Sequence, residues 1–191
     1  MRNVVVWMFA GVLWLPAQAS ALDFTSLAAH QHGHATLNVA ADGQDLLIEF
    51  NAPAIDVFGI EQRVADPSAQ QQLNQKVQWL KQLEWLSLPT SANCQATEVE
   101  VNSSVLPTQA PSLTANAHHH HAEQADTHVE DHADVVINVS LRCQQMPALT
   151  QLTLNFWAHD LHFDQIATQW ILPSGQGADT LSKAKPTLKF Q

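Results

Sequence analysis

HQHGHATLNVAADGQDLLIEF, residues 30–50, is the stretch that decides the fold class of this chain. Apolar residues alternate with polar ones on both sides of Asp42-Gly43, which is the pattern of strands with one buried face. Asp and Gly at that point are suited to the positive φ of a tight turn. The stretch therefore predicts a β-hairpin whose first strand has a polar, solvent-facing side. That side carries three histidines, His30, His32 and His34.

The rest of the chain continues the β pattern. Period-two alternation returns in residues 98–102, 134–141, 151–156 and 166–172, and a last strand is expected at 188–190. Residues 68–86 instead carry apolar side chains at helical spacing, after the helix-start pair Asp66-Pro67. We expect residues 53–59 to form a connection and residues 173–177 to form a turn. Six or more short strands with one amphipathic helix predict a mainly β, β-sandwich-like single domain.

The N-terminal residues have the features of an export signal. Arg2 precedes an apolar run that is too short to span a membrane, and a small-x-small cleavage pattern ends at Ala19. We expect residues 1–19 to be a signal peptide, cleaved after Ala19 or after Ala21, and residues 20–191 to be the exported domain. No later stretch reaches the roughly 18 apolar residues of a membrane span, so no membrane insertion is expected.

The charge of the chain is strongly acidic. It has 8 Lys and Arg residues against 18 Asp and Glu residues, which gives a formal net charge of −10. Loss of Arg2 with the signal peptide takes one positive charge away and moves the net charge from −10 to −11. An excess of acid argues against nucleic acid or an anionic membrane surface as a partner, and it favours cations.

Two cysteines are present, Cys94 and Cys143. In an oxidising compartment a disulfide between them is expected, and it would tie together the two strands that flank residues 107–131. The alternative is a thiolate metal site, which is less compatible with export because free thiols are poorly preserved outside the cytoplasm.

Residues 107–131 form a segment of unusual composition. A Pro-containing linker is followed by histidines and acidic residues with almost nothing to bury, which predicts a flexible, disordered insert. Neutral imidazole and carboxylate are ligands of zinc and of similar divalent metals, so the segment is interpreted as metal-binding. The alternative is a polar insert without ligands. The predicted ligands in and beside this insert are His118, His119, His120, His121, His128, Asp131, His132 and Asp134.

The predicted ligands differ in how firmly the chain holds them. His132 and Asp134 lie where the insert becomes a strand, so they should share one face and be better fixed than His118–His121. We expect a primary metal site that combines His132 and Asp134 with one or two hairpin histidines across the sheet. His159 and His162 lie near a strand end beside two aspartates, and they belong either to an additional site or to ordinary polar surface.

Four segments of the chain carry a resemblance to a known family. They are His30-Gln31-His32-Gly33-His34-Ala35, Pro53-Ala54 with Gly59-Ile60-Glu61, Glu130-Asp131-His132-Ala133-Asp134 before Cys143, and Pro173-Ser174-Gly175-Gln176-Gly177. In this order they resemble the ZrgA-type periplasmic zinc-uptake proteins. The resemblance implies a role in zinc acquisition beside a zinc ABC importer, with the insert as extra capacity. The ligands that it implies are His32, His34, His132 and Asp134.

The chain also departs from that family at two places. Gln62 stands where the family tends to have His, so a ligand role at that position is lost. Residues 158–163 replace a shorter family segment and carry their own histidines. Both departures bear on the number of zinc ions bound more than on function.

These observations predict a periplasmic accessory protein that binds Zn²⁺ and captures or buffers it for a zinc ABC importer. The alternative is sequestration of copper, nickel or zinc in the periplasm, since divalent copper outranks zinc in affinity for such ligands. An enzyme is not expected, because the chain has no His-Glu-x-x-His helix and no nucleophile elbow. A structural or adhesin-like β-domain with incidental histidines is the remaining class.

Overall fold

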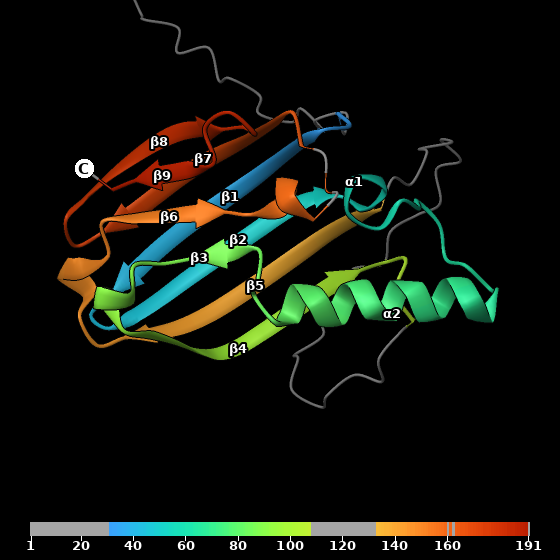
Figure 1. Ribbon diagram of the computed structural model, residues 1–191, viewed down its shortest axis with the longest axis horizontal. Coiled ribbons are helices and arrows are strands. Elements are labelled where there is room, and N and C mark those ends of the chain that lie inside the picture. Colours follow the sequence, from blue (N-terminus) through green and yellow to red (C-terminus); the bar gives the residue numbers. More distant parts are fainter. Residues whose placement is uncertain (1–30, 108–132, 160, 162, 191) are drawn as a thin grey trace, which may run out of the picture.

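The computed structural model describes residues 31–107, 133–159, 161 and 163–190. These residues form a mainly β domain of two sheets, as the sequence predicted, and it carries two α-helices where one was expected (Figure 1). The strands of the larger sheet are β1 (His34–Asp42), β2 (Asp45–Pro53), β4 (Cys94–Ser103), β5 (Asp134–Cys143), β7 (Gln165–Leu172) and β8 (Gly175–Leu181). The other elements are β3 (Leu86–Ser87), β6 (Gln151–Leu154), β9 (Thr187–Lys189), α1 (Ala54–Phe58) and α2 (Pro67–Lys81). The strand orders are β4-β5-β2-β1-β7-β8 and β3-β6-β9.

β1 and β2 form the predicted hairpin, with Gly43 in the turn at a φ of +59°. The first strand begins at His34, later than the alternation predicted. Gly33 has a φ of +78°, and His34 N donates to Gln31 O at 3.1 Å, so the chain makes a turn before the strand. His32 therefore lies in this turn and not in the strand, and its side chain is exposed.

α2 begins where the sequence predicted. Asp66 is the N-cap and accepts a hydrogen bond from Ala69 N at 2.8 Å, and Pro67 is the first helical residue. The helix ends at Lys81, earlier than predicted, because Leu83 adopts a left-handed φ of +59° and the chain then turns into β3. The apolar spacing continues past this end because the residues that follow also pack against the core.

The sequence did not predict α1, β3 or β8. α1 is a single helical turn inside the expected connection, and Gly59 closes it at a φ of +76°. β8 begins at Gly175, inside the expected turn, so the β7–β8 connection is tighter than the Gly and Pro content indicated. A Cβ on Gly177 would lie 2.2 Å from the Trp170 ring, so this glycine permits a close approach within a strand.

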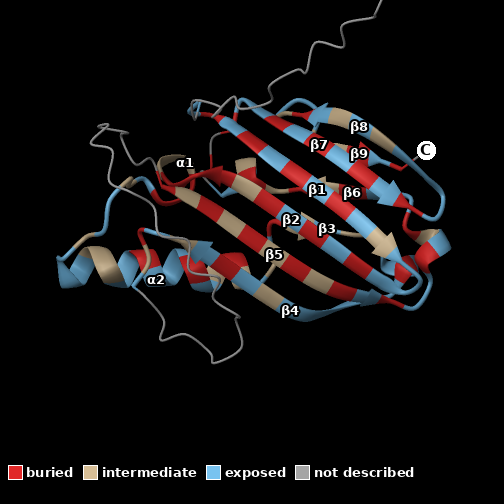
Figure 2. Cartoon of the chain, turned by 180° about the vertical axis from the view of Figure 1, so that it is seen from behind, coloured by how far each residue is buried: buried red, intermediate tan, exposed pale blue. Residues whose placement is uncertain are grey.

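The core lies between the two sheets and is centred on aromatic side chains. Phe156 packs on Phe50 with ring centroids 4.6 Å apart, and it stacks on Trp85 at 4.8 Å with an interplanar angle of 8°. Along β1, β2 and β5 buried residues alternate with exposed or half-buried ones (Figure 2). The larger sheet therefore has one face in the core and one facing outward.

The predicted disulfide joins Cys94 to Cys143. β4 and β5 are antiparallel neighbours, and the two cysteines are register partners at one end of this pair. At the other end Ser103 lies opposite Val135. The predicted insert joins β4 to β5 at that second end. Residues 108–132 lie outside the described part of the chain.

Candidate metal site

Four strand ends meet at one end of the larger sheet. Asp134, which starts β5, is the register partner of Pro53, which ends β2. His34, which starts β1, is the partner of Gln165, which starts β7. Continuing the β1–β2 register by two residues brings His34 opposite Pro53. We call this row of Asp134, Pro53, His34 and Gln165 the histidine end of the sheet.

His34 and Asp134 both belong to the outward set of the larger sheet. His34 alternates with buried neighbours and is exposed, and Asp134 is half-buried. Because β2 lies between β1 and β5, the two backbones are separated by roughly 10 Å, or two strand spacings. A metal site that combines His34 with Asp134 would therefore have to bridge β2, the strand between them.

The turn that carries His32 is fixed by the fold on both sides. Gly33 N donates to Asp56 Oδ2 at 2.7 Å, and Gly33 O accepts from Asp164 N at 2.7 Å and from Gln165 N at 3.1 Å. A Cβ at Gly33 would lie 2.7 Å from Asp164 Oδ2, so that carboxylate lies directly against the turn. The position therefore requires glycine for its space as well as for its positive φ.

The imidazole of His32 lies between two carboxylates. Nδ1 is 3.9 Å from Asp56 Oδ1, and Nε2 is 3.8 Å from Glu61 Oε1. The side chain of His32 is 60% exposed, whereas that of Asp56 is 11% exposed. These separations exceed a hydrogen bond, and they approach the roughly 3.4 Å that separates two ligands of one tetrahedral zinc ion. Because Nδ1 and Nε2 point in different directions, a cation bound by either nitrogen of this accessible imidazole would have one of the two carboxylates beside it.

The other described candidate, His159, has different surroundings. Its ring packs on that of Trp79 in α2, with centroids 4.8 Å apart and an interplanar angle of 47°. The two side chains border a shallow pocket together with Val57 and Leu161. The remaining predicted ligands lie outside the described residues, and they are His30, His118, His119, His120, His121, His128, Asp131, His132 and His162.

The described donors do not by themselves make a finished metal site. Across residues 31–107, 133–159, 161 and 163–190, no group of three or more His, Cys, Asp or Glu side chains is assembled to hold a metal ion. In the sequence, His30 is two residues from His32, and His132 is two residues from Asp134. Of the proposed donors, the structure therefore describes His34 and Asp134 at the histidine end and His32 in the turn beside it.

Sequence reasoning did not single out the carboxylates that surround His32. Asp56 lies in a short connection, where a single carboxylate has no periodic pattern to mark it. Glu61 appeared only in a segment that resembles a family, and Asp164 only as a neighbour of two histidines. Their approach to Gly33 and His32 follows from strand order, so no local signal identifies it.

Comparison with known proteins places this chain in a family. No helix among the described residues has the length and apolar character of a membrane span. A search of curated proteins finds no match. The sequence model of a family described as ZrgA family zinc uptake protein matches residues 29–190, a range that begins beside the histidine turn and includes both sheets. The chain therefore belongs to the ZrgA family of zinc uptake proteins.

Proposed function

We propose that this protein is a periplasmic, non-catalytic zinc-binding accessory protein that captures or buffers zinc and passes it to a zinc ABC importer. One observation carries the proposal: the exposed imidazole of His32 lies within 4 Å of the carboxylates of Asp56 and Glu61 in a turn that the fold holds in place. Imidazole nitrogen and carboxylate oxygen are both ordinary zinc ligands.

The primary site in this proposal is formed by His32, His34, His132 and Asp134. His34 and Asp134 lie in one outward-facing row, and the turn with His32 adjoins that row. Hydrogen bonds to Gly33 restrain the turn, which limits the ordering penalty on metal binding. The histidines of residues 118–128 act as additional, less selective capacity, because histidines adjacent in the sequence impose little coordination geometry.

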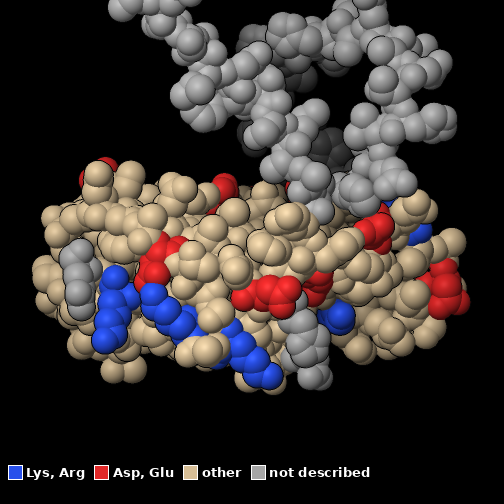
Figure 3. Space-filling model, turned by 90° about the horizontal axis from the view of Figure 1, so that it is seen from above, with Lys and Arg blue, Asp and Glu red and all other residues tan. Residues whose placement is uncertain are grey.

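The charge of the protein supports a cation as the bound species. The net charge is −10, and on the face drawn in Figure 3 acidic side chains lie at several places among basic ones. A negative surface potential raises the local concentration of cations and speeds their association. The negative charge therefore favours capture, while the imidazoles select for transition metals over calcium or magnesium.

The proposed compartment rests on two features. The Cys94–Cys143 disulfide fits an oxidising environment, and residues 1–19 have the composition of an export signal. A soluble carrier in that compartment needs a membrane transporter to move zinc inward. We propose a zinc ABC importer component as that partner, on the strength of the family's role in zinc uptake.

Native mass spectrometry with zinc tests the binding part of the proposal. The exported chain, residues 20–191, should bind several zinc ions, and a variant that lacks residues 117–131 should retain at least one. His132→Ala in the shortened variant should remove that ion, while Glu84→Gln, away from the histidine end, should leave it in place. A shortened variant that binds no zinc would show that no fixed site exists. Equal amounts of zinc, copper and nickel offered together would show whether sequestration of another metal describes the protein better.

A further inference from the structure

The outward face of the larger sheet continues beyond the histidine end into a region that contains none of the proposed zinc ligands. β3, β6 and β9 cover the other face, and α2 packs beside β4 (Figure 1). Seen from behind, no described helix or strand crosses in front of the outward face (Figure 2). This face is hollowed by a groove of about 950 Å³, with lining residues from β1, β2, β4, β5, β7 and β8. We call it the outer groove.

An apolar stripe crosses the outer groove. Leu47 is the register partner of Ala40, and Ala40 is the partner of Ile171, so the three side chains lie in one row on adjacent strands. Leu47 is 55% exposed and Ile171 is 63% exposed. Among the described residues, these two are the most exposed large apolar side chains. Ala40 between them is short, which leaves a shallow depression between two apolar walls. Exposed apolar side chains brought together in this way are typical of contact surfaces.

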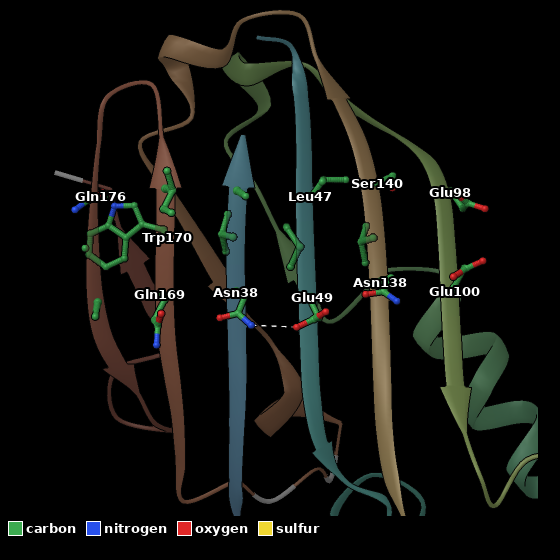
Figure 4. A pocket seen from close by; sticks show the side chains of 17 residues that line it. Asn38, Leu47, Glu49, Glu98, Glu100, Asn138, Ser140, Gln169, Trp170 and Gln176 are labelled. Carbon is green, nitrogen blue, oxygen red and sulfur yellow. Dashed lines mark hydrogen bonds between the residues drawn. The ribbon is translucent and has the colours of Figure 1, made fainter. Parts of the chain in front are cut away.

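One side of the stripe is acidic. Glu98 and Glu100 project from the edge strand β4, and Glu49 projects from β2 toward Asn38, whose Nδ2 donates to Glu49 Oε1 at 3.1 Å (Figure 4). Glu100 and Glu49 lie in one row, because each is a register partner of the same β5 residue. Among the residues that the structure describes, no Lys or Arg lines the groove, and Arg142 beyond its end lies 3.7 Å from Asp45.

From this surface we infer that the outer groove docks a basic, amphipathic segment of a partner protein. Apolar side chains of the segment contact Leu47 and Ile171, and its Lys or Arg side chains face Glu98 and Glu100. Charge complementarity decides between occupants, because two copies of this chain would bring two acidic rims together in a protein of net charge −10. This docking is independent of the histidine end of the sheet and of zinc.

Two-dimensional NMR of the exported chain at low salt tests the inference. The probe is a synthetic peptide of alternating Leu and Lys, compared with one of alternating Leu and Glu and one of alternating Ser and Lys. Addition of the Leu/Lys peptide should shift amide signals of the outward strands, and the other two peptides should bind more weakly. Leu47→Ser with Ile171→Ser should weaken binding about tenfold. Glu98→Gln with Glu100→Gln should weaken it about fivefold.

A charge-matched control separates the groove from general acidity. Asp66→Asn with Glu84→Gln removes the same charge away from the groove and keeps a capping residue for α2, so it should leave the affinity within about twofold. The inference is overturned if the control weakens binding as much as the glutamate pair, or if the shifted signals map to the acidic residues around His32. Self-association of the free protein through Leu47 and Ile171 would also overturn it, since a second copy would then be the occupant.

Discussion

Among single residues, Gly33 links the proposed zinc ligands to the rest of the fold. Its N–H is held by Asp56 and its carbonyl accepts from Asp164 N and Gln165 N, so α1 and the start of β7 both restrain it. His32 precedes this residue and His34 follows it. A short polar turn that would otherwise move freely is therefore fixed by contacts from two distant parts of the chain.

Two substitutions of Asp56 can separate the structural role of its hydrogen bond with Gly33 from the effect of its negative charge on zinc binding. Asp56→Ala leaves the partly buried Gly33 N–H without its acceptor, and we expect the free energy of unfolding to fall by about 1–2 kcal/mol. Asp56→Asn keeps an acceptor but loses the negative charge beside His32, so it should unfold at nearly the wild-type denaturant concentration. Both variants should bind zinc about tenfold more weakly by titration calorimetry.

The control for this pair is Asp42→Asn, which removes the same charge at the other end of β1. It should leave zinc affinity unchanged. If Asp56→Asn binds zinc as tightly as the wild type, the carboxylate near His32 has only a structural role.

At the scale of elements, the disulfide and the histidine end occupy opposite ends of the same strand. Cys143 closes β5 and Asp134 opens it. The bond therefore holds the β4–β5 pair together at one end while the predicted insert connects the other.

Removing the disulfide should lower stability without lowering zinc affinity. The bond closes a loop with a sequence separation of 49 residues, and its loss should reduce the free energy of unfolding by about 4 kcal/mol on the chain-entropy model. Urea unfolding of Cys94→Ser with Cys143→Ser, beside the reduced wild type, measures this change. A clear loss of zinc affinity in the folded variant would show that the disulfide also shapes the proposed site at the far end of β5.

The turn that follows β8 contributes a pH-dependent interaction. Lys185 Nζ donates to both carboxylate oxygens of Asp179 in β8, at 2.6 and 2.7 Å, and Thr180 N donates to Oδ1 at 2.8 Å. The hydrogen bond from Lys185, followed by that from Thr180, lowers the pKa of Asp179 below its ordinary value. A carboxyl group with a lowered pKa in the folded state stabilises the protein above its ordinary pKa and loses that contribution as the pH falls.

Lys185→Met should therefore be less stable than the wild type at pH 7, by no more than about 1 kcal/mol because both side chains are substantially exposed. The difference should shrink once the pH falls below about 3.9, the ordinary aspartate pKa. Urea unfolding at pH 7 and at a pH below about 3.9 measures this difference in stability. Lys183→Met removes a charge from the same loop and should show no such pH dependence; an equal dependence there would assign the effect to net charge.

At the scale of the whole molecule, the two faces of the larger sheet have separate tasks. The inner face packs on the smaller sheet and supplies the core, while the outward face is polar, acidic and open. The histidine end lies at one end of that outward face, and the outer groove lies further along the same strands. The proposed zinc binding and the inferred partner docking would therefore use one face without sharing side chains.

The whole protein should release zinc on mild acidification. Imidazole binds metal only when it is deprotonated, and free histidine titrates near pH 6.5. We expect zinc occupancy, measured by native mass spectrometry, to fall steeply between about pH 7 and pH 5. The deletion variant without residues 117–131 should follow the same trend with fewer ions. Zinc that stays fully bound at pH 5 would indicate carboxylates as the main ligands in place of imidazole.

Several features of this protein were determined by its sequence alone. Alternation in residues 34–50 is enough to specify the β1–β2 hairpin, and Asp66-Pro67 is enough to start α2, because these signals act between near neighbours in the chain. The only two cysteines, Cys94 and Cys143, allowed a single pairing. Helix and strand ends were less predictable, since apolar spacing past Lys81 reflects core packing and not helix.

Tertiary structure decided what surrounds the histidines and what the outward face presents. β2 lies between His34 and Asp134, Asp56 and Asp164 meet at Gly33, and Leu47 shares a row with Ile171 only because of strand order and register. The physical reason is that periodicity encodes which face a residue takes. The choice of neighbouring strand depends instead on the packing of the whole core, which no local segment contains.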